Sequence, residues 1–369
     1  MGTPLGNQVA GHIGGIETTE DGSLVIKSTL PLELEFYQTH STSAAFEPLR
    51  QFLPQFFGTL RLEGEHDTTH PNTLIVKPLP KDSIVLQNLA HTFLRPNIVD
   101  IKLGTVLYDE AALPAKRARA EKSARDTTTL ETGMRITGFQ VYDNETLTPI
   151  KTSKVYGKSI KPAELPSAIS RCFPVASTST IAQAGKAPSL GLPRSALLPI
   201  LESLREDVVE LHNILEGLEL RMVGASLLII HESDWDRAAQ GITYYTEEGS
   251  DDSDSMDDSE EDEEDEVGPP KRPGVPFTVN LIDFAHTRVA PGEGPDRGVL
   301  LGLSTLIKLL DGRIQDLRAT SMSHNIEVSD VMYLYSIATR VLSISLCYHD
   351  TQRTQCSRHG LKLPVRHGI

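Results

Sequence analysis

The clearest hydrophobic pattern along the chain is a stripe of apolar residues between positions 197 and 215. Its members recur at steps of 4, 3, 4, 3 and 4: Leu197, Leu201, Leu204, Val208, Leu211 and Leu215. This spacing puts them on one face of a long helix, which we predict packs against a lobe of the protein. A short coiled coil would give the same pattern, but about two and a half heptads are fewer than a sustained coiled coil needs.

Short apolar and β-branched runs bounded by turn residues predict strands. These runs are Leu24–Thr29, Thr73–Lys77, Ser83–Leu89, Ile98–Leu103, Arg135–Tyr142, Met222–His231 and Phe277–Phe284. Segments of helical composition predict further helices at Leu32–Thr39, Ala45–Phe57, Ala111–Arg125 and Gly298–Leu310. A first third rich in strands, followed by mixed helices and strands, favours a two-lobed α+β protein.

An acidic run separates the last two predicted strands. Glu247–Glu266 holds fourteen Asp or Glu and no Lys or Arg. Such a sequence cannot bury enough apolar surface to offset chain entropy, so we expect a disordered loop over 247–270 that interrupts a strand pair. Subtracting these fourteen charges from the formal net charge of −15 leaves −1, so the rest of the chain is nearly neutral and can contain a local basic site.

Composition argues against several classes of protein. The three cysteines, Cys172, Cys347 and Cys356, form no CxxC pair, which is typical of a reducing compartment and of a protein without a cysteine metal site. The first residues lack the basic and apolar regions of a signal peptide. No run of about 18 uncharged apolar residues predicts a membrane span. We therefore expect a soluble intracellular protein.

Two motifs indicate the chemistry. Pro96–Gly104 reads PNIVDIKLG, and Ile282–His286 reads IDFAH. The first resembles the PxxxDxKxG signature of the inositol polyphosphate kinase family, and the second matches the family's IDFAH motif. The pair in this order is specific, because each motif supplies the context that the other needs.

Three weaker blocks extend the resemblance. Gly224–Ile229 (GASLLI) is similar to the family's SSLL motif, with Ala225 in place of the first Ser. Leu32–Tyr37 (LELEFY) and Tyr156–Ser159 (YGKS) match two lesser motifs. The blocks keep the family's order over most of the chain and are most similar to the multikinase branch of fungal type.

The resemblance implies a protein-kinase-like, two-lobed α+β fold with a small helical inositol-phosphate-binding segment. Residues 1–90 would form a β-rich nucleotide lobe and 91–317 the catalytic lobe, with the substrate-binding segment at 109–135; 318–369 would be a tail outside the family. The implied activity is ATP-dependent phosphorylation of soluble inositol polyphosphates, from trisphosphate to tetrakis- and pentakisphosphate. Alternatives are an inositol trisphosphate 3-kinase or a hexakisphosphate kinase.

The resemblance assigns ATP and its metal to residues in both lobes. Asp283, at the end of an apolar strand, would bind the Mg²⁺ that bridges the nucleotide phosphates, since magnesium prefers hard carboxylates. Lys27 would bind nucleotide phosphate. Glu33 and Glu35 lie about 200° apart on a helix, so only one can face Lys27, and we favour Glu33. Leu86–Leu89 occupies the position of the adenine hinge, with Gln87 and Leu89 as ATP-binding residues. Many relatives have an acidic pair where this chain has Gln87-Asn88.

Asp100 and Lys102 are the predicted catalytic residues. They are two apart in a strand, so their side chains project from the same face. A carboxylate and an ammonium together can orient an acceptor hydroxyl and neutralise a transferring phosphoryl group. The family implies that Asp100 orients hydroxyls, and that Lys102 contacts substrate phosphate or the γ-phosphate. The alternative is a surface ion pair of little energetic consequence.

A basic helix follows this motif. Lys116, Arg119 and Lys122 form what we expect to be an unpaired cationic stripe, and Lys116 and Arg119 have no i,i+4 carboxylate; the stripe predicts binding of ring phosphates. On the other side, Arg117 and Arg125 share Glu121. The same composition would suit nuclear import or nucleic-acid contact. At the IDFAH motif, His286 would also line the substrate site.

The partners implied are ATP and inositol polyphosphates. A rival interpretation is an interaction protein, because fungal multikinases are associated with transcription-factor complexes and the acidic run is typical of a partner-binding segment. The intact Lys27, Asp100, Lys102 and Asp283 favour retained catalysis, and both roles can coexist. We expect a nuclear and cytoplasmic location and neither a membrane nor a nucleic-acid partner.

Overall fold

The computed structural model describes residues 3–6, 8–9, 15–60, 65–66, 74–75, 82–176, 189–248 and 274–319. Most of the predicted acidic loop (249–270) and the predicted tail from residue 320 lie outside the described residues. The chain divides into two compact units, Met1–Ile314 and Gln315–Ile369, and the fold below is that of the first. No helix in the described part of the chain is long and apolar enough to cross a membrane.

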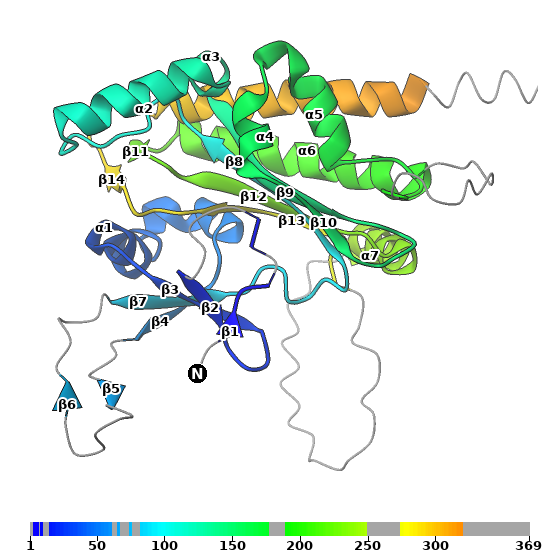
Figure 1. Cartoon of the computed structure of the whole chain (residues 1–369), viewed down its shortest axis with the longest axis horizontal. Coiled ribbons are helices and arrows are strands. Elements are labelled where there is room, and N and C mark those ends of the chain that lie inside the picture. The colour runs from blue at the N-terminus through cyan, green and yellow to red at the C-terminus, as the bar shows by residue number, and fades with distance from the viewer. Residues whose placement is uncertain are drawn as a thin grey trace, which may run out of the picture. The chain divides into compact units, whose positions relative to one another are not determined.

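A five-stranded antiparallel sheet comes from the start of the chain. Its order is β1-β2-β3-β7-β4 (Figure 1). The strands are β1 (Thr3–Pro4), β2 (Ile16–Thr18), β3 (Leu24–Ser28), β7 (Ser83–Gln87) and β4 (Phe56–Leu60). Between β3 and β4 the chain forms helix α1 (Pro31–Glu35), a π-helical turn (Phe36–His40) and a 3₁₀ helix (Ala44–Phe52).

A second five-stranded antiparallel sheet forms the core of the remaining part. Its order is β10-β9-β8-β12-β13. Seven of the eight residues of the central strand β8 are buried, which explains why its sequence is an almost continuous apolar run. The strands are β8 (Pro96–Leu103), β9 (Met134–Tyr142), β10 (Pro149–Thr152), β12 (Ser226–Glu232) and β13 (Phe277–Ile282). Two short ribbons pair β11 (Leu220–Met222) with β14 (Thr287–Val289) and β5 (Glu65–His66) with β6 (Leu74–Ile75).

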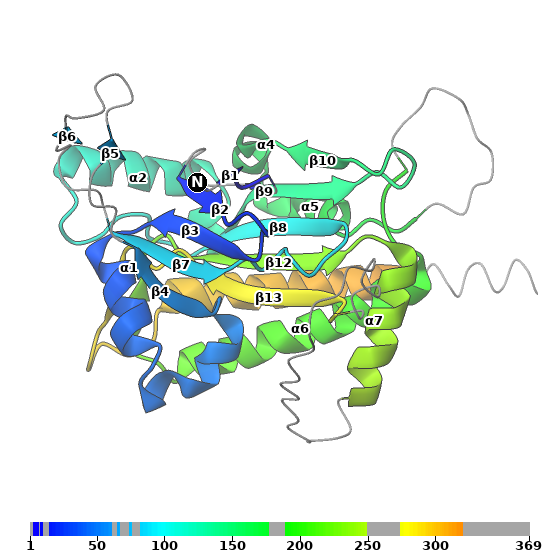
Figure 2. The same ribbon diagram turned by 90° about the horizontal axis from the view of Figure 1, so that it is seen from below.

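Helices pack on the second sheet. Helices α3, α4 and α5 contact β9, and α6 contacts β13 and α7 (Figures 1 and 2). Helix α2 precedes them and begins at Pro114, a residue suited to a first helical position. Their bounds are α2 (Pro114–Asp126), α3 (Thr129–Thr132), α4 (Lys154–Ser159), a 3₁₀ turn (Pro162–Glu164), α5 (Leu165–Cys172), α6 (Arg194–Glu216), α7 (Trp235–Glu248) and a helix over 297–319.

The periodic apolar stripe lies in α6. All six of its residues are at most 4% exposed, so the predicted packed helix is confirmed. The paired strands on either side of the acidic run are also confirmed, as β12 and β13.

Some elements differ between the prediction and the structure. The helix predicted over Ala45–Phe57 ends at Phe52, because Leu53 precedes Pro54 and takes the extended conformation that a following proline favours. The strand predicted over Met222–His231 is divided by Gly224, whose φ of 84° turns the chain between β11 and β12. Helix α7 was not predicted, and it takes in the first two glutamates of the acidic run.

Candidate active site

A cavity of about 340 Å³ lies between the two sheets. Strands β2, β3 and β7 line it on one side, and β8, β12 and β13 line it on the other. Its lining is mainly apolar, but it includes the charged residues Lys27, Asp100 and Asp283. One cavity therefore offers an apolar surface for a flat ring and charged groups for phosphates.

The connection from β7 to β8 forms one wall of this cavity. The predicted hinge residues Gln87 and Leu89 both line it, together with Asn88. The Asn88 amide nitrogen donates to the Gly22 carbonyl at 2.7 Å, and its side-chain oxygen accepts from the Ala90 N–H at 3.2 Å. The side chain of Asn88 thus holds the connection in shape, where an acidic residue would lack the amide donor.

Lys27 is held between two carboxylates. Its Nζ lies 2.7 Å from Glu33 Oε1 and 2.6 Å from Asp283 Oδ1. Burial lowers the pKa of Lys27, but the charges of Asp283 and Glu33 outweigh that effect and raise it. The ammonium is therefore charged and fixed at the cavity wall.

Glu33 is the inward-facing glutamate of α1, as predicted. It is 1% exposed, whereas the Glu35 side chain is 56% exposed. Besides Lys27, Glu33 accepts hydrogen bonds from Thr29 Oγ1 at 3.0 Å and from the Phe284 N–H at 3.2 Å. One buried carboxylate thus links β3, α1 and the residue after Asp283.

Asp283 leaves β13 in an unusual backbone conformation. Its φ is +67°, in the left-handed region that few residues other than glycine adopt. The next residue, Phe284, is fully buried and stacks on Phe36 with ring centroids 3.9 Å apart. This packing holds the turn, and the Asp283 side chain remains 39% exposed toward the cavity. Strain of this kind is found where a functional side chain must be presented.

Asp100 lies on the cavity wall and is 7% exposed. Its Oδ1 accepts a hydrogen bond from Thr137 Oγ1 at 2.5 Å. Burial raises the pKa of Asp100, and the charge of Asp283 raises it further, against the lowering effect of the Thr137 hydrogen bond. A carboxylate with a raised pKa is better suited to accept a proton than an ordinary one.

Lys102 has a buried basic neighbour that the sequence did not reveal. Its Nζ donates to the Gly224 carbonyl at 2.7 Å, and burial lowers its pKa. Arg135 is its cross-strand partner and is 8% exposed. The Arg135 Nη1 makes one long hydrogen bond, 3.5 Å, to Ser123 Oγ, and no carboxylate among the described residues forms an ion pair with it. The sequence offered one signal: Arg135 is the charged residue of an otherwise uncharged strand. That signal becomes informative only once the β8–β9 register places Arg135 next to Lys102.

The predicted cationic stripe of α2 requires a correction. Lys116 Nζ lies 3.7 Å from Asp109 Oδ2, and Lys122 Nζ lies 2.5 Å from Asp126 Oδ2. Asp109 precedes the helix and so falls outside the i,i+4 pattern, whereas Asp126 is the i+4 residue of Lys122 and was overlooked. Of the three, only Arg119 lacks a carboxylate partner within the described ranges.

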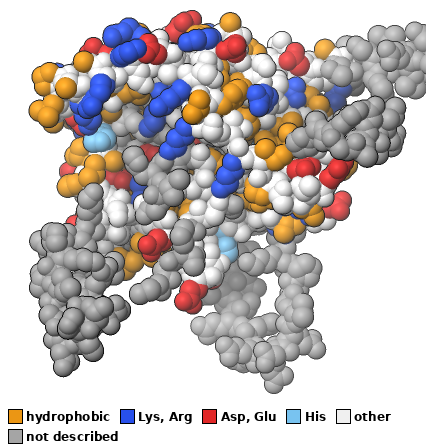
Figure 3. Space-filling view, in the orientation of Figure 1, with side chains coloured by type: hydrophobic (Ala, Val, Ile, Leu, Met, Phe, Trp, Pro, Cys, Tyr) orange, Lys and Arg blue, Asp and Glu red, His pale blue; other side chains and the backbone are white. Residues whose placement is uncertain are grey.

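On the other side of α2, one predicted ion pair is present and the other is not. Arg125 is paired with Glu121 at 3.9 Å, as predicted. Arg117 instead donates to the carbonyls of Ala112 and Glu110, with its guanidinium 5.6 Å from the Tyr108 ring centroid. The prediction that it shares Glu121 is wrong, because the turn before the helix offers nearer acceptors. Figure 3 shows Lys and Arg side chains gathered over the part of this face where α2 lies.

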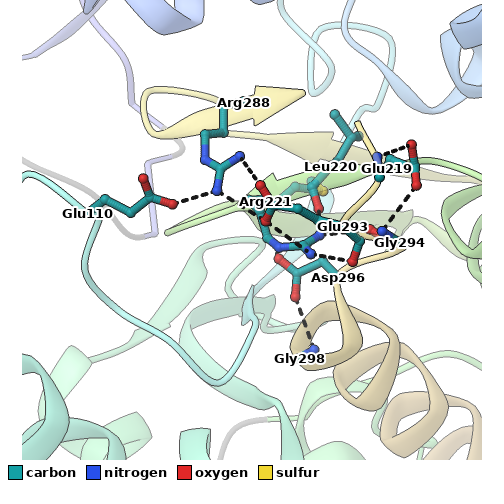
Figure 4. Close-up of polar contacts among 11 residues, drawn as sticks. Glu110, Glu219, Leu220, Arg221, Arg288, Glu293, Gly294, Asp296 and Gly298 are labelled. Carbon is teal, nitrogen blue, oxygen red and sulfur yellow. Dashed lines mark hydrogen bonds and ion pairs between the residues drawn. The ribbon is translucent and has the colours of Figure 1, made fainter. Parts of the chain in front are cut away.

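Two polar contacts connect the segment before α2 to the IDFAH region, one through His286 and one through Arg288. His286 Nδ1 lies 2.9 Å from Asp109 Oδ2. Arg288 pairs with Glu110 and, at 3.1 Å, with Glu293, as Figure 4 shows. The residues that would hold substrate on α2 are therefore tied to the strand that follows the predicted metal ligand. The role of His286 in lining a substrate site stays a prediction.

The fold and the residues of the cavity together indicate the class of protein. A lysine held by a helix glutamate beside one sheet, with carboxylates from a second sheet on the wall of the same cavity, is the architecture of a two-lobed kinase. A model of the family described as inositol polyphosphate kinase matches residues 83–311, more than half of the chain. The chain therefore belongs to the inositol polyphosphate kinase family.

Individual relatives and a solved structure are consistent with this family assignment. The inositol polyphosphate multikinase of Saccharomyces cerevisiae is 31% identical, and the match covers 83% of this chain and 96% of the relative. The inositol polyphosphate multikinase of Schizosaccharomyces pombe is 30% identical over 43% of this chain and 58% of the relative. A crystal structure of the inositol phosphate multikinase Ipk2 from S. cerevisiae, in complex with ADP and Mn²⁺, has a TM-score of 0.56 and 26% identity and covers 79% of this chain and all of that one. The predicted family and α+β fold are confirmed.

Proposed function

We propose that this chain transfers the γ-phosphate of ATP to hydroxyl groups of soluble inositol polyphosphates, converting trisphosphate to tetrakis- and pentakisphosphate. One observation carries the proposal: Lys27, Asp100 and Asp283, far apart in sequence, line one cavity between the two sheets. A second supports the acceptor class, since a basic surface lies over α2 (Figure 3). Phosphoryl transfer depends on positioning and charge stabilisation, which such an arrangement supplies.

ATP would enter with its base against the β7–β8 connection and its phosphates toward Lys27. The ammonium of Lys27 is fixed by Glu33 and Asp283, so little reorganisation is needed when it contacts phosphate oxygens. Gln87 and Leu89 lie on the wall where the base would pack. Base recognition at such a connection can use backbone groups, so the absence of an acidic pair is compatible with ATP binding.

The donor set suits magnesium. No cluster of three or more His, Cys, Asp or Glu in the described part of the chain could hold a metal by itself. Magnesium is commonly held by one or two carboxylates together with substrate phosphates and water, and the partly exposed carboxylate of Asp283 can serve in this way. When bound, the ion would neutralise charge that develops on the phosphate oxygens. Lys27 would then share Asp283 with the metal.

The acceptor hydroxyl would meet Asp100. The raised pKa of Asp100 favours its acceptance of the hydroxyl proton, and Thr137 fixes the orientation of its carboxylate. Lys102 and Arg135 lie side by side in the β8–β9 register and would bind substrate phosphate on the same face of the sheet. Arg135 is suited to this role because its buried guanidinium has few protein partners.

Other phosphates of the acceptor would contact α2. Arg119 is the stripe residue without a carboxylate partner in the described ranges, so its guanidinium is the most available. Lys116 and Lys122 would bind phosphate only in exchange for Asp109 and Asp126. His286 lies beside Asp109 and would contribute at the edge of the same surface.

Product analysis tests this function. The purified chain would be incubated with ATP, Mg²⁺ and either inositol trisphosphate or inositol hexakisphosphate, and the products would be resolved by chromatography. We expect tetrakis- and pentakisphosphate from the first substrate and little pyrophosphate from the second. Exclusive formation of pyrophosphates from the hexakisphosphate would contradict the multikinase assignment and favour a hexakisphosphate kinase.

A further inference from the structure

One part of the nucleotide cavity is built by a stretch of chain that lies before the region matched by the family model, which begins at residue 83. We call Thr3–Gly6 and Gln8–Val9 the strap. Its residues Leu5, Gln8 and Val9 line the same cavity as Lys27 and the β7–β8 connection. The cavity therefore has a third wall, in addition to its two sheets.

The strap joins the first sheet at one end. Strand β1 (Thr3–Pro4) pairs antiparallel with β2, at the edge of the sheet shown in Figures 1 and 2. The Leu5 N–H continues this pairing with the Ile16 carbonyl at 3.4 Å. Ile16 also lines the cavity, so the strap enters the wall directly from the strand next to it.

The other end of the strap lies on the second sheet. Lys151 on β10 donates its Nζ to the Gly6 carbonyl at 2.6 Å and to the Gln8 carbonyl at 3.4 Å. At Gly138 on β9, a Cβ atom would lie only 2.2 Å from the Val9 carbonyl oxygen. The backbone of the strap can approach β9 this closely only because position 138 has no side chain.

Val9 also contributes an apolar contact next to the β7–β8 connection. It packs against the buried cluster of Ala90, Phe93, Ile98 and Ile230, together with Leu89 and Leu228. Leu89 belongs to the predicted hinge and Ala90 directly follows it, and both line the cavity. Val9 is thus placed beside the base-binding end of the cavity rather than beside the phosphate-binding lysine.

From these contacts we propose that the strap is part of the ATP site: Leu5 and Val9 pack against the adenine and ribose of the nucleotide, and Lys151 is the positioning residue that holds the strap across the two sheets. This inference rests on the proposed function, because it takes ATP as the occupant of the cavity. It adds residues outside the family motifs to the nucleotide site. It also gives Lys151, an exposed lysine that does not line the cavity, a defined effect on nucleotide affinity.

The test compares Lys151→Met with Lys308→Met. Lys308 is exposed on the helix over 297–319 and is a matched control for loss of one surface lysine. Equilibrium binding of a fluorescent ATP analogue would be measured for the wild type and both variants, together with KM for ATP and for inositol trisphosphate. Lys151→Met should weaken ATP binding and raise KM for ATP roughly 3- to 10-fold, with kcat and KM for the inositol phosphate nearly unchanged. Lys308→Met should match the wild type.

A second variant tests the packing contact. Val9→Asp puts a charge against the apolar cluster and should weaken ATP binding at least as much as Lys151→Met. If the wild type binds ATP, and Lys151→Met and Val9→Asp bind it as tightly as the wild type does, the strap inference is overturned while the proposed function stands. A lower Tm without any change in ATP affinity would overturn it as well, because the strap would then only stabilise the fold. A wild type that binds no ATP would overturn both.

Discussion

Lys27 and Asp283 are separated by 256 positions in the chain, yet Lys27 Nζ lies 2.6 Å from Asp283 Oδ1. The contact joins the first sheet to the end of β13 in the second. Glu33 reinforces it, because the same carboxylate binds Lys27 and the backbone N–H next to Asp283. A nucleotide between the sheets would therefore meet a lysine and a carboxylate whose positions depend on each other.

Glu33→Gln should weaken nucleotide use, because it removes one of the two charges that hold Lys27. We expect kcat/KM for ATP to fall roughly 10- to 150-fold, corresponding to about 1.5–3 kcal/mol for a hydrogen bond to a charged group. Steady-state kinetics with varied ATP checks this. Glu35→Gln, on the exposed side of the same helix, is the matched control and should change little. Equal losses in the two variants would argue against a specific role for Glu33.

The basic surface of α2 should act mainly through Arg119. Arg119→Ala should raise KM for the inositol phosphate about 10-fold and leave KM for ATP unchanged, because no carboxylate in the described part of the chain has to release its guanidinium. Lys122→Ala should have a smaller effect, since Lys122 is paired with Asp126. Added salt should reduce the Arg119 effect by screening. A larger loss at Lys122 than at Arg119 would contradict this ranking.

Asp109 should act through His286. Asp109 also pairs with Lys116, so all variants are made in a Lys116→Ala background. There Asp109→Ala frees the imidazole, so we expect KM for the inositol phosphate to rise about 5-fold, while Asp109→Asn, which can still accept the hydrogen bond, should keep most of the affinity. A double-mutant cycle separates this from a general loss of structure: in a His286→Ala background, Asp109→Ala should add little. Fully additive effects would show that the two residues act independently.

Asp207 on α6 should make stability depend on pH. Burial, together with the charges of Glu210 and Glu206, raises the pKa of Asp207 from 3.8 to about 6. The folded chain then keeps a proton that the unfolded chain has lost, so the free energy of unfolding falls as the pH rises from about 4 to 6. Asp207→Asn should stabilise the protein by about 1 kcal/mol near pH 7.5, allowing for partial exposure of the group, and less near pH 5. Thermal unfolding at the two pH values checks this, and equal stabilisation at both would contradict the cause given.

Short-range patterns predicted much of the fold and part of the site. The α6 stripe followed from helical periodicity, and Glu33 was separable from Glu35 by the angle between them on one helix. Asp100 and Asp283 lie in the two signature motifs, and Lys27 lies in a predicted strand, so the resemblance could anticipate their placement at one site.

The remaining features depend on contacts between distant segments. Arg135 becomes a neighbour of Lys102 only through the β8–β9 register. Asp109 contacts Lys116 and His286 from the turn before α2. Because it lies outside the helix, the i,i+4 rule could not predict these contacts. The strap contacts β9 and β10 more than a hundred residues later, through backbone carbonyls that have no sequence signature. Helix α7 extends into the acidic run, and the acidic composition there gave no sign of where the helix ends.

The central claim is that the cavity between the two sheets is a kinase active site. Transfer of labelled γ-phosphate from ATP to inositol trisphosphate, measured in parallel for the wild type and Asp283→Asn, tests it most directly. Circular dichroism would confirm that the variant is folded. The account predicts labelled inositol tetrakis- and pentakisphosphate from the wild type, and a rate lowered at least about 100-fold in Asp283→Asn, since the carboxylate for the metal is lost. No labelled inositol phosphate from the wild type, or near wild-type turnover by the folded variant, would contradict it.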